Sequence, residues 1–143
     1  MASGHLLEDS FEVTDIAPKH FARVSRFVCQ SDGYDLTLTL DVHAELCSLA
    51  LRQKFTLTIT TSLGDGFPAE AHYHNPEGKP SLLDRSDYAM HGVVFEIDDK
   101  SPGYLQVLGS FGGLLMALKG EARYLKRFEV DQKIYLLIRY NKS

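Results

Sequence analysis

The sequence predicts an all-β fold, either a barrel or a sandwich of short strands. Apolar and polar residues alternate with a period of two in several segments, which is typical of strands with one face in a core and the other in water. Turn-favouring residues separate these segments, and seven or eight strands are expected. Helical spacing of apolar residues is confined to one short segment, residues 121–129.

The N-terminal half contains the clearest alternation. A short strand is expected near residues 10–16, and residues 21–31 are rich in residues that favour strands. Strict alternation then appears in "YDLTLTLDVHAEL" (34–46) and "FTLTITTSL" (55–63). Residues predicted to face the core are Leu36, Leu38, Leu40, Val42, Ala44 and Leu46 in the first segment and Phe55, Leu57, Ile59 and Leu63 in the second. Asp41 falls on the opposite, solvent-facing side of its strand.

The C-terminal half continues the pattern. Strands are expected at residues 88–99, 104–111, 114–120 and 133–140. In the first of these, Val93, Phe95 and Ile97 share one face. Residues 64–87 are different, because they contain three glycines and three prolines and show no sustained period. We therefore expect one domain over residues 6–140, with a long flexible loop at 64–87.

Composition limits the functional classes. The chain has 143 residues, is 44% hydrophobic and carries a net charge of −4, which argues mildly against a dedicated nucleic-acid binder. Seven Lys or Arg and three acids follow from Lys119 onward, giving about +4 there and about −8 elsewhere. This basic segment is either a solvated face or a patch that meets an acidic partner. No apolar run spans a bilayer and no signal peptide is evident, so an intracellular location is expected.

The stretch "GSFGGLLMALKG" (109–120) invites a phosphate-binding interpretation that its spacing opposes. A P-loop needs a Gly-Lys pair followed by Ser or Thr, whereas Leu118 precedes Lys119 and Gly120 follows it. The preferred interpretation is that Gly112 and Gly113 form a structural bend or bulge between two strands.

No catalytic or metal-binding constellation stands out. His72 and His74 are spaced to share a metal, with His43 and His91 as further candidates, but solvated loop histidines explain them as well. Cys29 and Cys47 are isolated from any CxxC pattern, and two such cysteines are most often plain thiols. We expect no catalytic residues, no metal and no cofactor.

The segment "PKHFARVSRF" (18–27) supports an alternative function. It places Lys19, Arg23 and Arg26 among the aromatic residues Phe21 and Phe27. Small barrels of the OB type bind single-stranded nucleic acids with basic and aromatic residues on one face. The other explanation is that the phenylalanines belong to the core and the cations are solvated.

Six motifs follow one another along nearly the whole chain. They are "LLEDSFEVTDIAP", "FARVSR", "LTLTLDVHAELCSLALRQKFTLTI", "DRSDYAMHGVVFEI", "SFGGLLMALKG" and "FEVDQKIYLLIR". In these motifs and their order the chain resembles the eighth subunit of the eukaryotic nuclear RNA polymerases, the small subunit shared by polymerases I, II and III. His91 stands where that family often has tyrosine, and residues 64–87 align poorly.

The resemblance implies an antiparallel eight-stranded, OB-like barrel with a long loop and at most one short helix. It implies a non-catalytic structural subunit that docks on the largest subunit of polymerases I, II and III, contacts neighbouring subunits and stabilises the assembled enzyme. The expected location is the nucleus, including the nucleolus, with no membrane association. Weak, non-specific binding of single-stranded DNA is also implied for the early strands, with Lys19, Phe21, Arg23 and Arg26 as candidate contacts.

Overall fold

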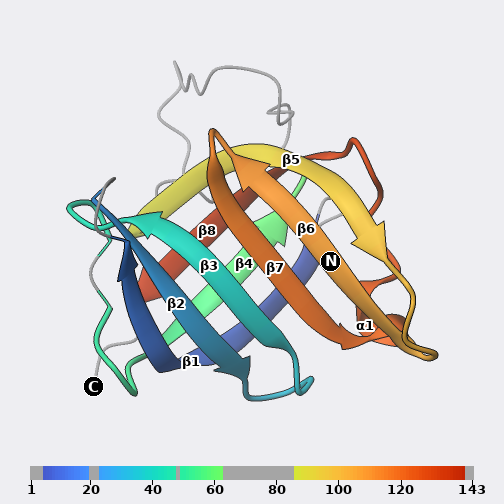
Figure 1. Cartoon of the computed structure of the whole chain (residues 1–143), viewed down its shortest axis with the longest axis horizontal. Helices are drawn as coiled ribbons and strands as arrows, with labels where there is room; N and C mark the ends of the chain where they lie inside the picture. Colours follow the sequence, from blue (N-terminus) through green and yellow to red (C-terminus); the bar gives the residue numbers. More distant parts are fainter. Residues whose placement is uncertain (1–4, 20–22, 48, 63–85, 141–143) are drawn as a thin grey trace.

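The computed structural model describes residues 5–19, 23–47, 49–62 and 86–140. Eight strands and one short helix lie in these ranges (Figure 1). The strands are β1 (His5–Lys19), β2 (Val24–Ser31), β3 (Thr37–His43), β4 (Lys54–Thr60), β5 (Tyr88–Asp98), β6 (Tyr104–Phe111), β7 (Leu114–Glu121) and β8 (Lys133–Tyr140); the helix is α1 (Ala122–Leu125). The predicted loop 64–87 lies outside the described residues except for its last two positions.

The strands close into a barrel in the order β1-β2-β3-β7-β6-β5-β8-β4, and every neighbouring pair is antiparallel. The prediction of an all-β antiparallel barrel with eight strands and one short helix is confirmed. β1 is longer than expected, because its first half pairs with β4 and its second half with β2. A register shift between Val13 and Asp15 bends it from one neighbour to the other.

The barrel wall is one closed sheet with two four-stranded halves. β4, β1, β2 and β3 come from the N-terminal half of the chain, and β7, β6, β5 and β8 come from the C-terminal half. The halves meet along two seams. Residues 37–40 of β3 pair with residues 116–119 of β7, and residues 55–60 of β4 pair with residues 135–140 of β8. Because both seams are hydrogen-bonded ladders, the barrel has no free edge.

The core fills the barrel interior. In β3 and β4 most of the side chains that the alternation predicted to face the core are buried there. Leu36, Leu38, Leu40 and Val42 have no exposed surface, and neither do Phe55, Leu57 and Ile59. The prediction was wrong for Ala44 and Leu46, which are exposed, Leu46 at 67%. β3 ends at His43 and the chain turns there, so the period of two no longer applies. Leu63 lies outside the described residues.

The prediction that Val93, Phe95 and Ile97 share one face of β5 was also wrong. Phe95 is 46% exposed, whereas its neighbour Val94 is completely buried. The pairing of β5 with β6 shifts register between Val94 and Glu96, which leaves Phe95 as the extra residue of a β-bulge. The bulge interrupts the alternation, and Ile97 returns to the core as a half-buried residue.

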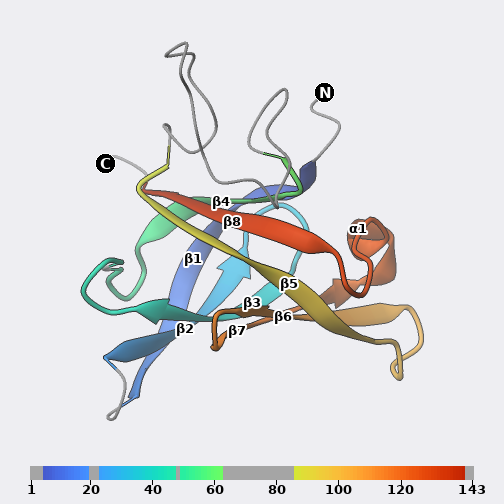
Figure 2. The same ribbon diagram turned by 90° about the horizontal axis from the view of Figure 1, so that it is seen from above.

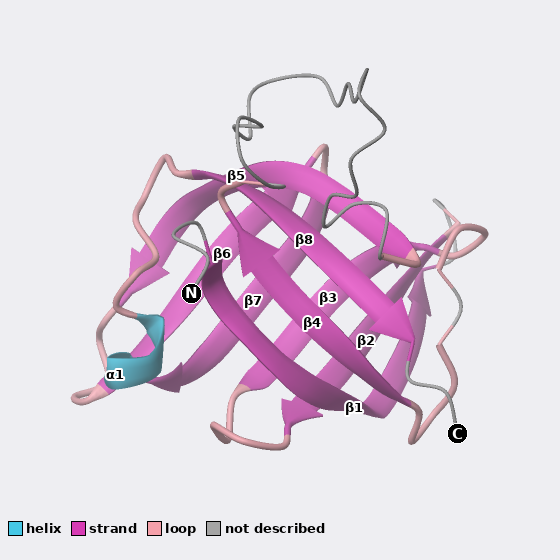
Figure 3. Cartoon of the chain, turned by 180° about the vertical axis from the view of Figure 1, so that it is seen from behind, coloured by secondary structure: helices cyan, strands magenta, loops and turns pink. Residues whose placement is uncertain are grey.

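The helix α1 follows β7 directly and lies at one end of the barrel (Figure 2 and Figure 3). It is a single turn, shorter than the segment 121–129 with helical spacing. Leu125 is fully buried and Phe128, just beyond the helix, is 4% exposed. These two side chains anchor the turn to the core, which supplies the stability that so short a helix lacks alone.

Candidate functional site

Arg26, a candidate DNA contact, forms an ion pair with Asp41 on the neighbouring strand. Arg26 in β2 stands directly across from Asp41 in β3. Its Nε and Nη2 atoms donate hydrogen bonds to the two carboxylate oxygens of Asp41 at 2.7 and 3.1 Å. The hydrogen bond to Asp41 raises the pKa of Arg26, although partial burial opposes this.

Asp41 is the residue whose burial the alternation did not predict. Its side chain is only 2% exposed, although it stands on the predicted solvent face. Besides the guanidinium of Arg26, its Oδ2 accepts a hydrogen bond from the backbone N–H of Leu115 at 3.2 Å. The ladder between β3 and β7 ends at the pair Leu40 and Met116, so this side chain continues the seam by one more bond.

Lys19 and Arg23, two other predicted DNA contacts, lie at the connection between β1 and β2, where Lys19 pairs with Val24. Arg23 has a left-handed backbone with φ of 51° and donates a hydrogen bond from Nη1 to Glu45 at 2.8 Å, with both side chains exposed. Lys19 is the last residue of β1, and Phe21 lies outside the described residues. Arg23 and Arg26 thus each bind a carboxylate, and a phosphate would have to compete with these carboxylates. Binding of single strands here stays a prediction.

Gly112 and Gly113 form the two-residue connection of the hairpin between β6 and β7. Phe111 pairs with Leu114, and the two glycines have φ values of 65° and 99°. Positive φ at both central residues is what the type I′ hairpin turn requires, and glycine adopts it without strain. A Cβ atom at either position would meet nothing within 4 Å, so the requirement is torsional and not steric.

At Gly120, the end of the same sequence motif, glycine is required because of close packing and not because of backbone torsion. A Cβ atom there would collide with the side chain of Leu36. Gly120 and Leu36 lie one position beyond the pair Lys119 and Thr37 at the end of the seam between β3 and β7. The motif therefore serves both the hairpin and the seam, and none of its glycines forms a phosphate-binding loop in this arrangement.

Metal-ligand side chains do not gather in the part of the chain that the structure describes, where no group of three or more His, Cys, Asp or Glu residues could hold an ion. His91 is exposed, and its ring lies tilted against that of Tyr135, with ring centroids 4.9 Å apart. His72 and His74 lie outside the described residues. Cys29 and Cys47 are buried free thiols, and burial raises the pKa of Cys29 to about 12.

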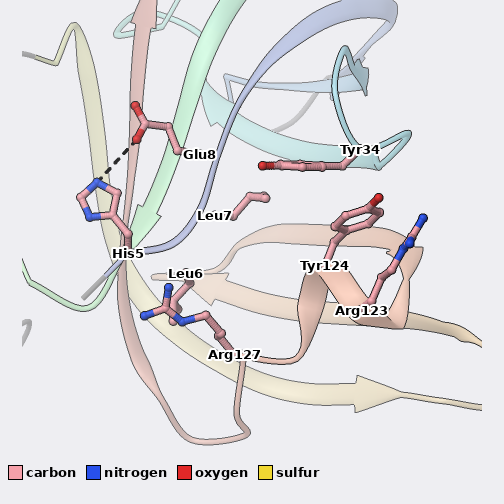
Figure 4. Close-up of a pocket in the computed structure, with 8 residues that line it drawn as sticks. All are labelled: His5, Leu6, Leu7, Glu8, Tyr34, Arg123, Tyr124 and Arg127. Atoms are coloured by element: carbon pink, nitrogen blue, oxygen red, sulfur yellow. Dashed lines mark ion pairs between the residues drawn. The ribbon is translucent and has the colours of Figure 1, made fainter. Parts of the chain in front are cut away.

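A groove of about 550 Å³ lies where the start of β1, the turn before β3 and the α1 segment meet (Figure 4). We call it the basic groove; its lining residues are His5, Leu6, Leu7, Glu8, Tyr34, Arg123, Tyr124 and Arg127. Sequence reasoning did not find it, because its residues come from three segments far apart in the chain. The one signal was the excess of cations that begins at Lys119.

Aromatic and charged contacts order the rim of the basic groove. The rings of Tyr34 and Tyr124 lie 4.7 Å apart, and the guanidinium of Arg123 lies 4.7 Å from the centre of the Tyr124 ring. Arg123 also contacts Glu121 at 3.3 Å. On the other side His5 Nε2 is 3.7 Å from Glu8 Oε1. This combination can bind a ligand that carries both apolar and anionic groups.

Among the helices in the described ranges, none has the length and apolar character needed to cross a membrane.

Comparison with known proteins identifies the family. The model of the RNA polymerase Rpb8 family matches residues 8–140. A Dictyostelium discoideum protein named as a subunit of DNA-directed RNA polymerases I, II and III is 40% identical over 137 residues, which cover 94% of this chain and 96% of that protein. An Arabidopsis thaliana protein named as subunit 8B of polymerases II, IV and V is 38% identical over 146 residues, covering 97% and 99%. A Saccharomyces cerevisiae protein named as a subunit of polymerases I, II and III is 34% identical over 145 residues, covering 96% and 99%. The chain belongs to the RNA polymerase Rpb8 family.

Proposed function

We propose that this chain is a non-catalytic structural subunit shared by the nuclear RNA polymerases I, II and III. It docks on the largest subunit, contacts neighbouring subunits and stabilises the assembled enzyme in the nucleus, including the nucleolus. The observation that carries the proposal is the family match over residues 8–140 together with relatives whose names place them in several polymerases at once.

The closed barrel suits such a role. A subunit shared by several enzymes must present one fixed surface to different partners, and a barrel with two hydrogen-bonded seams holds its surface residues in fixed positions. Large apolar side chains exposed on the surface can be buried against a partner, as is common at docking surfaces. They are Tyr34, Leu46, Leu51, Phe95, Tyr104, Leu115 and Val130.

Affinity purification tests this proposal. The chain would be tagged, expressed in eukaryotic cells and purified gently at low salt, and the bound proteins identified by mass spectrometry. We expect the largest subunits of all three polymerases, which an unrelated tagged barrel does not retain. A fluorescent fusion should concentrate in the nucleus and nucleolus. If tagged protein that folds normally retains none of the largest subunits, the proposal is wrong.

A further inference from the structure

The basic groove joins an apolar floor to a basic rim. Leu6 and Leu7 are 9% and 6% exposed and form its floor. Figure 4 shows the tilted rings of Tyr34 and Tyr124 on one side of Leu7, with Arg123 next to Tyr124. Arg127 also lines the groove. A ligand that lies in the groove therefore meets leucine side chains beneath it and guanidinium groups at its edge.

The charge around the groove is local and differs from that of the chain. Arg123 and Arg127 line it, and Lys126 lies between them in the sequence, all three with exposed side chains. Glu8 is the one acidic residue among the lining residues, and it contacts His5. Glu121, beside the groove, contacts Arg123 at 3.3 Å, so a partner carboxylate would compete with it for that guanidinium. Residues before Lys119 carry about −8 in total, so this basic patch stands out on an acidic protein. Such a patch attracts an acidic partner surface.

The contacts within the groove favour a peptide over a nucleic acid. Nucleic-acid single strands bind mainly by stacking bases on aromatic rings. The Tyr124 ring is already in contact with Tyr34 and with the guanidinium of Arg123. Arginine binds carboxylates and phosphates alike in a paired geometry, so the guanidinium groups do not distinguish the two ligands. The buried leucine floor does, because it suits an aliphatic side chain, which an acidic peptide can supply.

We propose that the basic groove binds an acidic segment of a protein partner, whose carboxylates pair with Arg123 and Arg127 and whose aliphatic side chain rests on Leu6 and Leu7. The identification of that partner as a polymerase subunit rests on the function proposed above. The binding of acidic peptide by the groove does not.

Fluorescence anisotropy on the full-length protein tests the binding. The probe is a labelled octapeptide in which two leucines stand among glutamates, and the control peptide carries glutamine in place of glutamate. We expect saturable binding of the acidic peptide only, weakening as salt rises. The double variant Arg123→Gln/Arg127→Gln should bind about tenfold more weakly, as expected for the loss of two exposed ion pairs.

A matched variant controls for the change in net charge. Lys100→Gln/Arg52→Gln removes the same charge from the β5–β6 and β3–β4 connections, which do not line the groove, and should bind like wild type. Thermal unfolding of both double variants checks that they are folded. The proposal is overturned if the glutamine peptide binds equally well, if the two double variants bind alike, or if no saturation occurs at millimolar peptide. It is also overturned if an oligothymidylate binds more tightly and loses affinity in the Arg123→Gln/Arg127→Gln variant.

A pull-down separates this inference from the proposed function. Tagged wild type and both double variants would be purified from cells at low salt. If Arg123→Gln/Arg127→Gln alone loses polymerase subunits, the groove is a docking site in that enzyme. If all three retain the subunits equally, the groove does not dock the polymerase and the proposed function stands. If wild type retains none, the proposed function fails while the peptide measurements still decide what the groove binds.

Discussion

Asp41 combines two tasks in one buried carboxylate. It balances the charge of Arg26 across the β2–β3 ladder and accepts the N–H of Leu115 where the β3–β7 ladder ends. A carboxylate with 2% exposure needs such contacts, because burying a charge without its counter-ion is costly. The cation that looked like a phosphate contact in the sequence thus has a structural partner.

Removing the cation should therefore cost more than removing the pair. We expect Arg26→Leu to lower the free energy of unfolding by about 2 kcal/mol, which is less than for a fully buried pair because Arg26 is 35% exposed. Arg26→Leu/Asp41→Asn should recover part of this loss, since the buried charge is gone. Urea unfolding of the three proteins measures it. A double variant less stable than Arg26→Leu would contradict this account of the pair.

Cys29 makes stability depend on pH in the alkaline range. Burial raises its pKa from an ordinary value of 9.0 to about 12, with a smaller effect of Cys47. Between these values the unfolded chain has lost the thiol proton and the folded chain keeps it. The stabilising contribution is complete below pH 9 and is lost as the pH rises toward 12.

We expect the stabilising contribution of Cys29 to the free energy of unfolding to fall by up to about 1.4 kcal/mol for each pH unit of increase within that window. Urea unfolding at several pH values between 8 and 11, on wild type and on Cys29→Ala, measures the contribution. Burial likewise raises the pKa of Cys47, Tyr88 and Tyr135, and these groups are present in both proteins. The slope should be smaller in Cys29→Ala, and identical slopes would show that the thiol is not protected from ionisation.

The hairpin between β6 and β7 shows how backbone torsion selects residues within an element. Asparagine tolerates the left-handed region, whereas a β-branched residue does not. We expect Gly112→Asn to leave the free energy of unfolding nearly unchanged and Gly112→Val to lower it by about 1–2 kcal/mol. The added Cβ meets no steric obstacle in either variant, since a Cβ at Gly112 has nothing within 4 Å. Thermal and urea unfolding measure both; equal losses would show that torsion is not the reason for glycine here.

The elements differ in how far their sequence predicts them. β4 follows its alternation without exception from Phe55 to Ile59, because it is a regular strand paired on both sides. β5 does not, because a bulge at Phe95 reverses the faces, and bulges have no period to detect. Asp41 carries no local signal of burial, since Arg26 and Leu115 reach it from other strands. The basic groove depends on contacts between distant segments and was visible only as an excess of charge.

Across the whole molecule, the two seams decide stability, because each half of the barrel supplies only a four-stranded sheet. We expect residues 1–62 and residues 86–143, expressed separately, to be largely unfolded, and to recover strand content when co-expressed. Circular dichroism of each fragment and of the purified pair measures this. An Asp41→Ala change in the first fragment should weaken reassembly, because it removes the last bond of the β3–β7 seam. A fragment that folds alone would show that closure is not required.

The order of strands around the barrel also determines when each strand meets its partner during synthesis. The ribosome synthesises β1 to β4 first, and these four strands are neighbours in the final barrel. The two outer strands of this half, β3 and β4, pair with β7 and β8, which have not yet been translated. β8, which completes the second seam, is the last strand to leave the ribosome. The nascent chain therefore exposes two bare strand edges until synthesis is almost finished, and this interval is when it depends most on chaperones to avoid pairing with other nascent chains.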